Sequence, residues 1–151
     1  MKYVRKVLFI LHLVVGIGAC AGGYACIVDP LAPLGAPLAL LEGSPFDSFL
    51  IPGMVLFGLF GIGNLFGAVQ LHRRFRWQGY IAGILGVGMV VWIIVQVLVI
   101  GSIVFLHVLF LIIGIVQAVI GYLLLAEEDQ FPVSLIRKFK SKIATGSRHK
   151  Q

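Results

Sequence analysis

The chain has 151 residues, of which 60% are hydrophobic and only 12% are charged, and its formal net charge is +6. Its mean hydropathy of +1.05 excludes a soluble globular domain, because the chain has too few polar residues to cover a folded surface. The positive charge would suit nucleic acid in a soluble protein. Here it lies at predicted membrane borders, which argues against nucleic-acid binding.

Four apolar stretches predict four transmembrane helices, at about residues 7–28, 49–71, 80–100 and 104–125. Each approximates the ~20 residues that a helix needs to cross the hydrocarbon core. Because the backbone must satisfy its own hydrogen bonds in lipid, these spans are expected to be helical, and the short connections predict an antiparallel up-down four-helix bundle. We expect one transmembrane domain, residues 1–129, followed by a basic cytoplasmic tail, residues 130–151.

Positive charge occurs in alternate gaps between these stretches. All twelve Lys and Arg residues lie before the first stretch, between the second and third, or after the fourth. By the positive-inside rule, both chain termini are predicted to be cytoplasmic. Basic side chains at these borders are expected to contact anionic lipid headgroups. The predicted headgroup contacts are Arg73, Arg74, Arg76, Arg137, Lys138, Lys140 and Lys142.

The first stretch permits two interpretations. Ile17-Gly18-Ala19-Cys20 is similar to a bacterial lipobox, in which signal cleavage leaves a lipidated cysteine at the new N-terminus. The apolar run continues to Val28, so the segment is also long enough to remain an uncleaved anchor, which we favour. Cys20 and Cys26 lie six residues apart, too far along one helix for a disulfide, and are predicted to be small buried hydrophobic residues.

Every stretch contains two small residues four positions apart, the spacing that lets transmembrane helices approach closely. With nineteen glycines in the chain, individual pairs of this kind also arise by chance. We predict tight helix packing through the pairs Gly18 and Gly22, Gly63 and Gly67, Gly79 and Gly83, and Gly114 and Ala118.

Residues 29–48, between the first and second stretches, are too apolar for a solvated loop. Four prolines in this segment forbid a continuous helix. Residues 38–41, Leu-Ala-Leu-Leu, require burial in lipid headgroups or against the bundle. We therefore predict a folded, proline-rich cap on the outer end of the bundle.

Polar side chains within the spans need partners at bilayer depth and often carry function. At ~1.5 Å per residue, Asn64 and Gln117 both lie roughly 20 Å below the outer ends of their helices. We predict that they form an intramembrane hydrogen-bonded pair. Gln96 and His107 flank the tight turn at Gly101, so both are expected roughly one to two turns below the outer surface.

These depths predict an outward-facing polar pocket beneath the cap, formed by Glu42, Asp47, Gln96 and His107. Such a set suits a cation, a metal ion or a lipid headgroup. The alternative is that Gln96 and His107 only join adjacent helices by a hydrogen bond, while the two carboxylates face water. No His or Glu residues have the spacing of a metal site, so no metal and no other cofactor are predicted.

The segment after the fourth stretch has the pattern of an amphipathic helix. Leu135, Ile136, Phe139 and Ile143 recur at helical spacing, and basic residues fill most of the other positions. This pattern predicts a helix that lies on an anionic leaflet. A solvated tail that only enforces topology is the alternative.

Three short segments carry a resemblance to known proteins. Leu41-Glu-Gly-Ser-Pro-Phe46, Leu50-Ile-Pro-Gly53 and Trp92-Ile-Ile-Val-Gln96 look like the corresponding parts of a group of small, uncharacterised bacterial four-span proteins. The overall plan is similar to that of the DoxX-like membrane proteins. The resemblance implies the four-span fold and a bacterial cytoplasmic membrane, and it brings no catalytic motif.

Function is predicted only as a class. The chain has no paired intramembrane carboxylates, no metal-spaced histidines and no activated nucleophile, so we expect a non-enzymatic protein. It is expected to act by assembly with itself, with another membrane protein or with lipid. The alternative is a small carrier or channel for an ion, lipid or small solute, which would need Asn64, Gln96, His107 and Gln117 to face one cavity.

Overall fold

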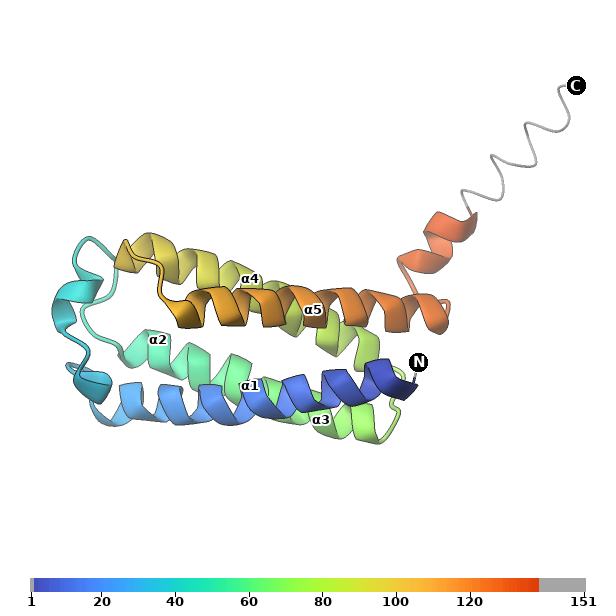
Figure 1. Ribbon diagram of the computed structural model, residues 1–151, viewed down its shortest axis with the longest axis horizontal. Coiled ribbons are helices and arrows are strands. Elements are labelled where there is room, and N and C mark those ends of the chain that lie inside the picture. The colour runs from blue at the N-terminus through green and yellow to red at the C-terminus, as the bar shows by residue number, and fades with distance from the viewer. Residues whose placement is uncertain (1, 139–151) are drawn as a thin grey trace, which may run out of the picture.

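The structure is a computed structural model that describes residues 2–138. Over this range every regular element is helical, and four helices are long and apolar enough to cross a membrane. They are α1 (Lys2–Val28), the second span (Leu50–His72), α4 (Gln78–Ile100) and α5 (Phe105–Glu127), shown in Figure 1. The four predicted helical spans are confirmed, and their ends differ from the predicted ones by no more than five residues.

The helices run alternately up and down, so the connections lie at two ends of the bundle (Figure 1). Residues 29–49 and the α4–α5 connection lie at one end, here termed the cap end. The start of α1, residues 73–77 and the end of α5 lie at the other, here termed the terminus end. The α4–α5 turn depends on Gly101, whose φ of 69° is a left-handed conformation that glycine adopts without steric cost.

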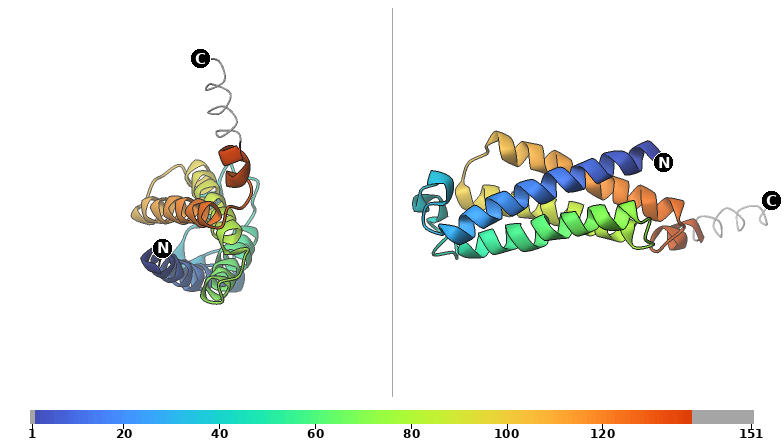
Figure 2. Two further views of the ribbon diagram at one scale, coloured as in Figure 1. Left: turned by 90° about the vertical axis from the view of Figure 1, so that its right-hand side faces the viewer. Right: turned by 90° about the horizontal axis from the view of Figure 1, so that it is seen from below.

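The bundle is built from two closely packed helical hairpins. In the first, α1 packs along the second span, and in the second, α4 packs along α5. Contacts between the two hairpins are sparser. The two helices α1 and α5 cross, as Figure 2 shows, and they lie farther apart at the cap end than at the terminus end.

Glycines let the helices of the second hairpin approach closely, with a spacing of seven residues. A Cβ on Gly86 would lie 2.6 Å from Gly114 O, and a Cβ on Gly121 would lie 2.5 Å from Gly83 N. Gly79 and Gly86 are seven residues apart, as are Gly114 and Gly121. This is the heptad period of left-handed helix pairs, so the tight packing follows that period and not the four-residue spacing alone.

The first hairpin uses the same period. A Cβ on Gly16 would lie 2.8 Å from the Leu65 side chain, and one on Gly23 would lie 2.5 Å from Phe57 N. By contrast, a Cβ on Gly18 would meet no atom within 4 Å. The predicted packing pair that includes Gly18 is therefore wrong, because Gly18 borders a cavity between the hairpins instead.

The second span is not a uniform α-helix. An α-helical turn, α2 (Leu50–Val55), passes into a π-helix, η3 (Leu56–Ile62), and then into α3 (Gly63–His72). A π-helix holds more residues per turn than an α-helix, so it changes the direction in which all later side chains of the span point.

The core consists of two apolar layers with polar side chains between them. The buried members of the layer nearer the cap end are Val15, Ala19, Phe60, Met89, Ile93 and Ile113. Those of the layer nearer the terminus end are Leu8, Leu71, Ala82, Ile120 and Leu124. In lipid, such layers hold helices together through van der Waals packing, because burial brings no gain over contact with lipid chains.

Residues 29–49 fold over the cap end. They contain two short 3₁₀-helices, η1 (Pro33–Gly35) and η2 (Leu38–Leu41), and Phe49 N donates to Pro30 O at 2.8 Å across the base of the segment. The predicted fold of this segment is therefore present. Within η2 only Leu41 is buried, so the burial expected for residues 38–41 is limited to the residue that faces α4.

The segment after α5 begins with a short helix over residues 133–138. Val133 is buried, whereas Leu135 and Ile136 are about half exposed. Arg137 donates to Ala126 O at 3.1 Å and forms an ion pair with Asp129 at 3.3 Å. The remaining residues of the predicted amphipathic helix, Phe139, Lys140, Lys142 and Ile143, lie outside the described residues.

Candidate functional site

Three polar side chains meet in the middle of the bundle, between the two apolar layers. His12 comes from α1, Asn64 from α3 and Gln117 from α5, and each is at most 1% exposed. His12 Nδ1 lies 2.8 Å from Asn64 Oδ1, and Gln117 Nε2 donates to the same Asn64 oxygen at 2.8 Å. This cluster, here termed the central triad, joins the two hairpins at mid-depth.

Asn64 is the central member of the triad. Its Nδ2 donates to Phe60 O at 2.8 Å, within the π-helix, which fixes the direction of its oxygen. With the His12 proton on Nδ1, that oxygen accepts two hydrogen bonds, one from each hairpin. Gln117 Oε1 is buried and has no donor among the described residues, so the triad is connected but not fully satisfied.

The structure brings Asn64 and Gln117 together, as their predicted depths require, and adds a third member that sequence reasoning missed. The predicted depths concern only polar residues of the second, third and fourth spans, so they say nothing of α1. Counted from the terminus end, all three residues lie eight to ten positions inside their helices. Since His12 is the only histidine of the first stretch, this count would have found it.

The imidazole of His12 lies close to Gly67 in α3. A Cβ on Gly67 would lie 3.0 Å from His12 Cε1 and 3.2 Å from each ring nitrogen. The absence of a side chain at Gly67 therefore leaves room for the imidazole between α1 and α3. The predicted small pair Gly63 and Gly67 packs against two different helices, because a Cβ on Gly63 would lie 3.1 Å from Leu85 in α4.

A cavity of about 270 Å³ separates the hairpins at the cap end. Its walls come from α1, the second span, α4 and α5, and most of them are apolar. Its lining residues are Gly18, Ala19, Gly22, Leu56, Met89, Trp92, Ile93, Gln96, Val104, Leu106, His107 and Phe110. Val104 and Leu106 are about half exposed, so the cavity reaches the outer surface of the bundle where α1 and α5 diverge.

Three polar side chains line this cavity. Trp92 Nε1 is buried and has no acceptor among residues 2–138. His107 Nδ1 accepts the Val104 N–H at 3.3 Å, so the neutral ring carries its proton on Nε2. Gln96 is partly buried, and its amide supplies both a donor and an acceptor. The cavity therefore offers the His107 Nε2 donor and the Gln96 amide in apolar surroundings, whereas the Trp92 nitrogen is itself buried.

The predicted polar pocket is only half formed. Gln96 and His107 do line one cavity, but Glu42 and Asp47 are exposed and line neither it nor the smaller space beneath η2. The carboxylates stay in water because the apolar side of the cap, including Leu41, faces the bundle. Nor does a hydrogen bond join Gln96 to His107 within the described residues, since His107 Nδ1 caps its own helix.

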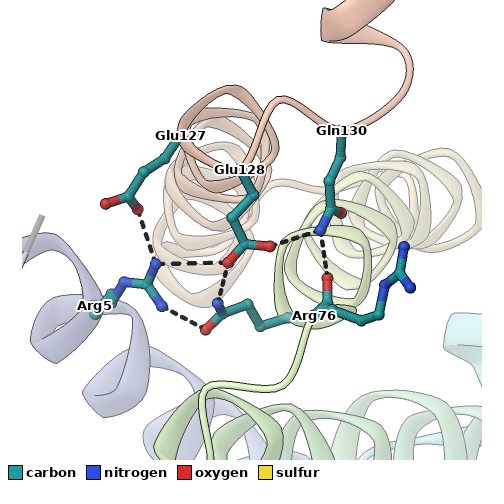
Figure 3. Close-up of polar contacts among 6 residues, drawn as sticks. Arg5, Arg76, Glu127, Glu128 and Gln130 are labelled. Carbon is teal, nitrogen blue, oxygen red and sulfur yellow. Dashed lines mark hydrogen bonds and ion pairs between the residues drawn. The ribbon is translucent and has the colours of Figure 1, made fainter.

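A third polar cluster lies at the terminus end and connects α1 to the second hairpin (Figure 3). Arg5 donates to Gln78 Oε1 and to Glu127 Oε2, both at 2.8 Å, and lies 3.7 Å from Glu128. Gln78 Nε2 in turn donates to Glu128 at 2.6 Å. Gln130 extends this network by donating to Glu128 and to Arg76 O. The cluster closes the hairpin interface at this end.

The predicted headgroup residues also lie at the terminus end. Arg73, Arg74 and Arg76 are exposed beyond the second span, and the Arg76 guanidinium lies 5.5 Å from the centre of the Trp77 ring. Arg137 and Lys138 are exposed in the short helix after α5. Lys140 and Lys142 lie outside the described residues. Across residues 2–138, no group of three or more His, Cys, Asp or Glu side chains is placed to hold a metal ion.

Comparison with known proteins gives no match to a protein-family model, to a curated protein or to a solved structure. The resemblance to DoxX-like proteins therefore stays a prediction from the overall plan of the four spans. The candidate sites are argued from this chain's own residues.

Proposed function

We propose that this chain is a non-enzymatic, multi-pass protein of the bacterial cytoplasmic membrane that binds a lipid-like molecule in the cap-end cavity. The observation that carries the proposal is an apolar cavity between two helical hairpins that is lined by the polar side chains of Gln96 and His107. Ligand sites of this type combine apolar walls with a few polar groups that fix orientation. The cavity volume of about 270 Å³ suits one small ligand or part of a larger one.

The chemistry of the walls defines the class of ligand. His107 Nε2 is a donor, and the Gln96 amide is both a donor and an acceptor, so the ligand should carry an oxygen that accepts hydrogen bonds. No carboxylate and no Lys or Arg lines the cavity, and a charged ligand would lose its hydration there without a charged partner. An uncharged lipid with ester carbonyl groups meets both conditions, and it can enter from the bilayer between α1 and α5.

The proposed topology places both termini in the cytoplasm and the cap outside. It is supported by the positions of the basic residues, all of which lie at the terminus end or beyond it in the sequence. In this orientation the cap-end cavity opens toward the outer leaflet, and the Arg5 cluster lies at the inner leaflet.

The other candidate functions receive less support from the geometry. A carrier or channel would need its polar residues on one path, but Asn64 and Gln117 are fully buried in the central triad and do not line the cavity. Self-assembly through glycine faces is weakened because the tightest glycine contacts are made within each hairpin. Association with a membrane protein partner stays a prediction.

Fluorescence of Trp92 tests the proposal directly. The chain has two tryptophans, so a Trp77→Phe background leaves Trp92 as the only reporter. The protein is placed in phosphatidylcholine nanodiscs that contain a low mole fraction of diacylglycerol with dibrominated acyl chains, which quench tryptophan at contact. Binding in the cavity predicts quenching several-fold above that expected from the mole fraction of the probe.

Two glycine variants serve as a matched pair for this experiment. Gly18→Leu fills the cavity, since Gly18 lines it and has open space beside it, and should return quenching to the random level. Gly83→Leu adds the same side chain at another open position outside the cavity and should leave the excess quenching unchanged. Quenching of Trp92 at the random level in the Trp77→Phe background protein would refute the proposal.

Native mass spectrometry of the chain released from its own membrane then distinguishes lipid from protein partners. A full-length chain that retains an uncharged lipid supports the proposal. A stoichiometric protein partner with no retained lipid would support assembly instead.

A further inference from the structure

A second, different binding site lies at the terminus end, where a basic cavity meets an apolar groove. The cavity has a volume of about 420 Å³ and is formed by the first turns of α1, the end of α3 and Arg74. It is lined by Lys2, Arg5, Lys6, Phe9, Ile10, Leu71, His72 and Arg74. It is separate from the cap-end cavity, with which it shares no residue.

The charge in this cavity is largely uncompensated. Arg5 is paired with Glu127 and lies near Glu128, so the acidic groups at the end of α5 are already engaged. Lys2 and Arg74 border a smaller adjoining space together with these glutamates, but neither of them forms an ion pair within residues 2–138, and nor does Lys6. Lys2, Lys6 and Arg74 are therefore three cations without an ion-pair partner among the described residues.

An apolar groove continues from this cavity along the first hairpin. Its volume is about 460 Å³, and it shares Phe9 and His72 with the basic cavity. The rings of these two residues lie 6.2 Å apart, at the boundary between the two spaces. The remaining groove residues are Leu13, Leu65, Ala68, Val69 and Arg73. The groove thus runs from the membrane border toward the middle of the bilayer, between α1 and α3.

We infer that this composite site binds an anionic phospholipid, with its phosphate among Lys2, Lys6 and Arg74 and one acyl chain in the groove. Charge complementarity selects the headgroup, since basic pockets at helix ends attract anionic lipids. The groove selects a lipid over a free phosphate, because only the lipid has a chain that covers Leu13 and Val69. A free anion would use the basic cavity alone.

The test measures the binding of phosphatidylglycerol to the full chain in detergent by native mass spectrometry, with phosphatidylcholine as the competing lipid. Lys6→Gln and Arg74→Gln should each weaken phosphatidylglycerol binding about fivefold, and the double variant about 25-fold, from ~1 kcal/mol per basic residue. Both residues are exposed, so the thermal stability of the variants should be unchanged.

A charge control separates a defined site from general surface charge. Arg76→Gln removes the same charge at the same end, but Arg76 does not line the basic cavity. Its variant should keep the affinity for phosphatidylglycerol within twofold. If Arg76→Gln weakens binding as much as Arg74→Gln, or if the unmodified chain binds both lipids equally, the inference is wrong.

A groove variant and a free anion distinguish a lipid from a phosphate. Val69→Trp blocks the groove from an exposed position and should weaken binding several-fold, whereas Val91→Trp on the exposed face of α4 should not. Excess inorganic phosphate should displace the lipid poorly. Efficient displacement by phosphate, together with no effect of Val69→Trp, would show that the site recognises an anion and not a lipid.

Discussion

The two hairpins meet in different ways at the middle of the bundle and at its cap end. In the middle, polar side chains of α1, α3 and α5 pack against one another, and Asn64 and Gln117 are fully buried. At the cap end, Gln96 of α4 and His107 of α5 border a cavity, and no hydrogen bond joins them within the described residues. We therefore propose that polar residues within the spans stabilise packing where neighbours satisfy their hydrogen bonds, and that they bind a ligand where neighbours do not.

The largest effect is expected from removing the shared acceptor of the central triad. Asn64→Leu removes the acceptor that His12 Nδ1 and Gln117 Nε2 share in a buried site, and leaves them only their own contact at 3.2 Å. An unsatisfied buried group costs about 1–3 kcal/mol, so the free energy of unfolding should fall by about 3 kcal/mol. Unfolding of the reconstituted protein, followed by circular dichroism in a denaturing detergent, measures this change. A loss below about 0.5 kcal/mol would mean that the triad does not join the hairpins.

A smaller loss is expected from crowding the triad without removing a polar group. Gly67→Ala places a methyl group 3.0 Å from His12 Cε1, so the imidazole must shift and its hydrogen bond must lengthen. Overpacking of this kind costs about 1–3 kcal/mol. Gly83→Ala is the control, because its Cβ meets no atom within 4 Å. The comparison fails if both variants have the same thermal midpoint.

Loss of a polar side chain should affect stability less at the cavity than in the central triad. Gln96 makes no side-chain hydrogen bond within the described residues, so Gln96→Leu should change the free energy of unfolding by no more than about 0.5 kcal/mol. Quenching of Trp92 by the brominated diacylglycerol should change instead, because a wall of the cavity is altered. Destabilisation by Gln96→Leu comparable to that of Asn64→Leu would remove the distinction between the two regions.

The smallest effect is expected at the carboxylates of the cap. Glu42 and Asp47 are exposed and do not line the cavity. Glu42→Gln and Asp47→Asn should therefore leave both the stability and the diacylglycerol quenching of Trp92 unchanged. A loss of quenching in either variant would instead support the predicted pocket of Glu42, Asp47, Gln96 and His107.

Hydropathy and charge were sufficient to predict the four helical spans. Each span by itself must be apolar and long enough to cross the bilayer, and it must satisfy its own backbone hydrogen bonds. The contact between Asn64 and Gln117 also follows from helix depth, since neighbouring helices at one depth have few other partners. The cavity depends instead on how far α1 and α5 diverge, which is a property of the packed hairpins. The contacts of glycines seven residues apart were not predicted, because some of these glycines also belong to pairs four residues apart, such as Gly79 and Gly83.

The π-helix η3 has a consequence for how this sequence can change. It lies between the cap and Asn64, and it sets the rotation of every residue from Gly63 to His72. A π-turn takes up one residue more than an α-turn, so deletion of one residue within Leu56–Ile62 would restore a regular α-helix and keep Asn64 and Gly67 directed at His12. Insertion of one further residue would instead turn them about 100° away from His12. The segment can thus lose a residue without breaking the central triad, but it cannot gain one.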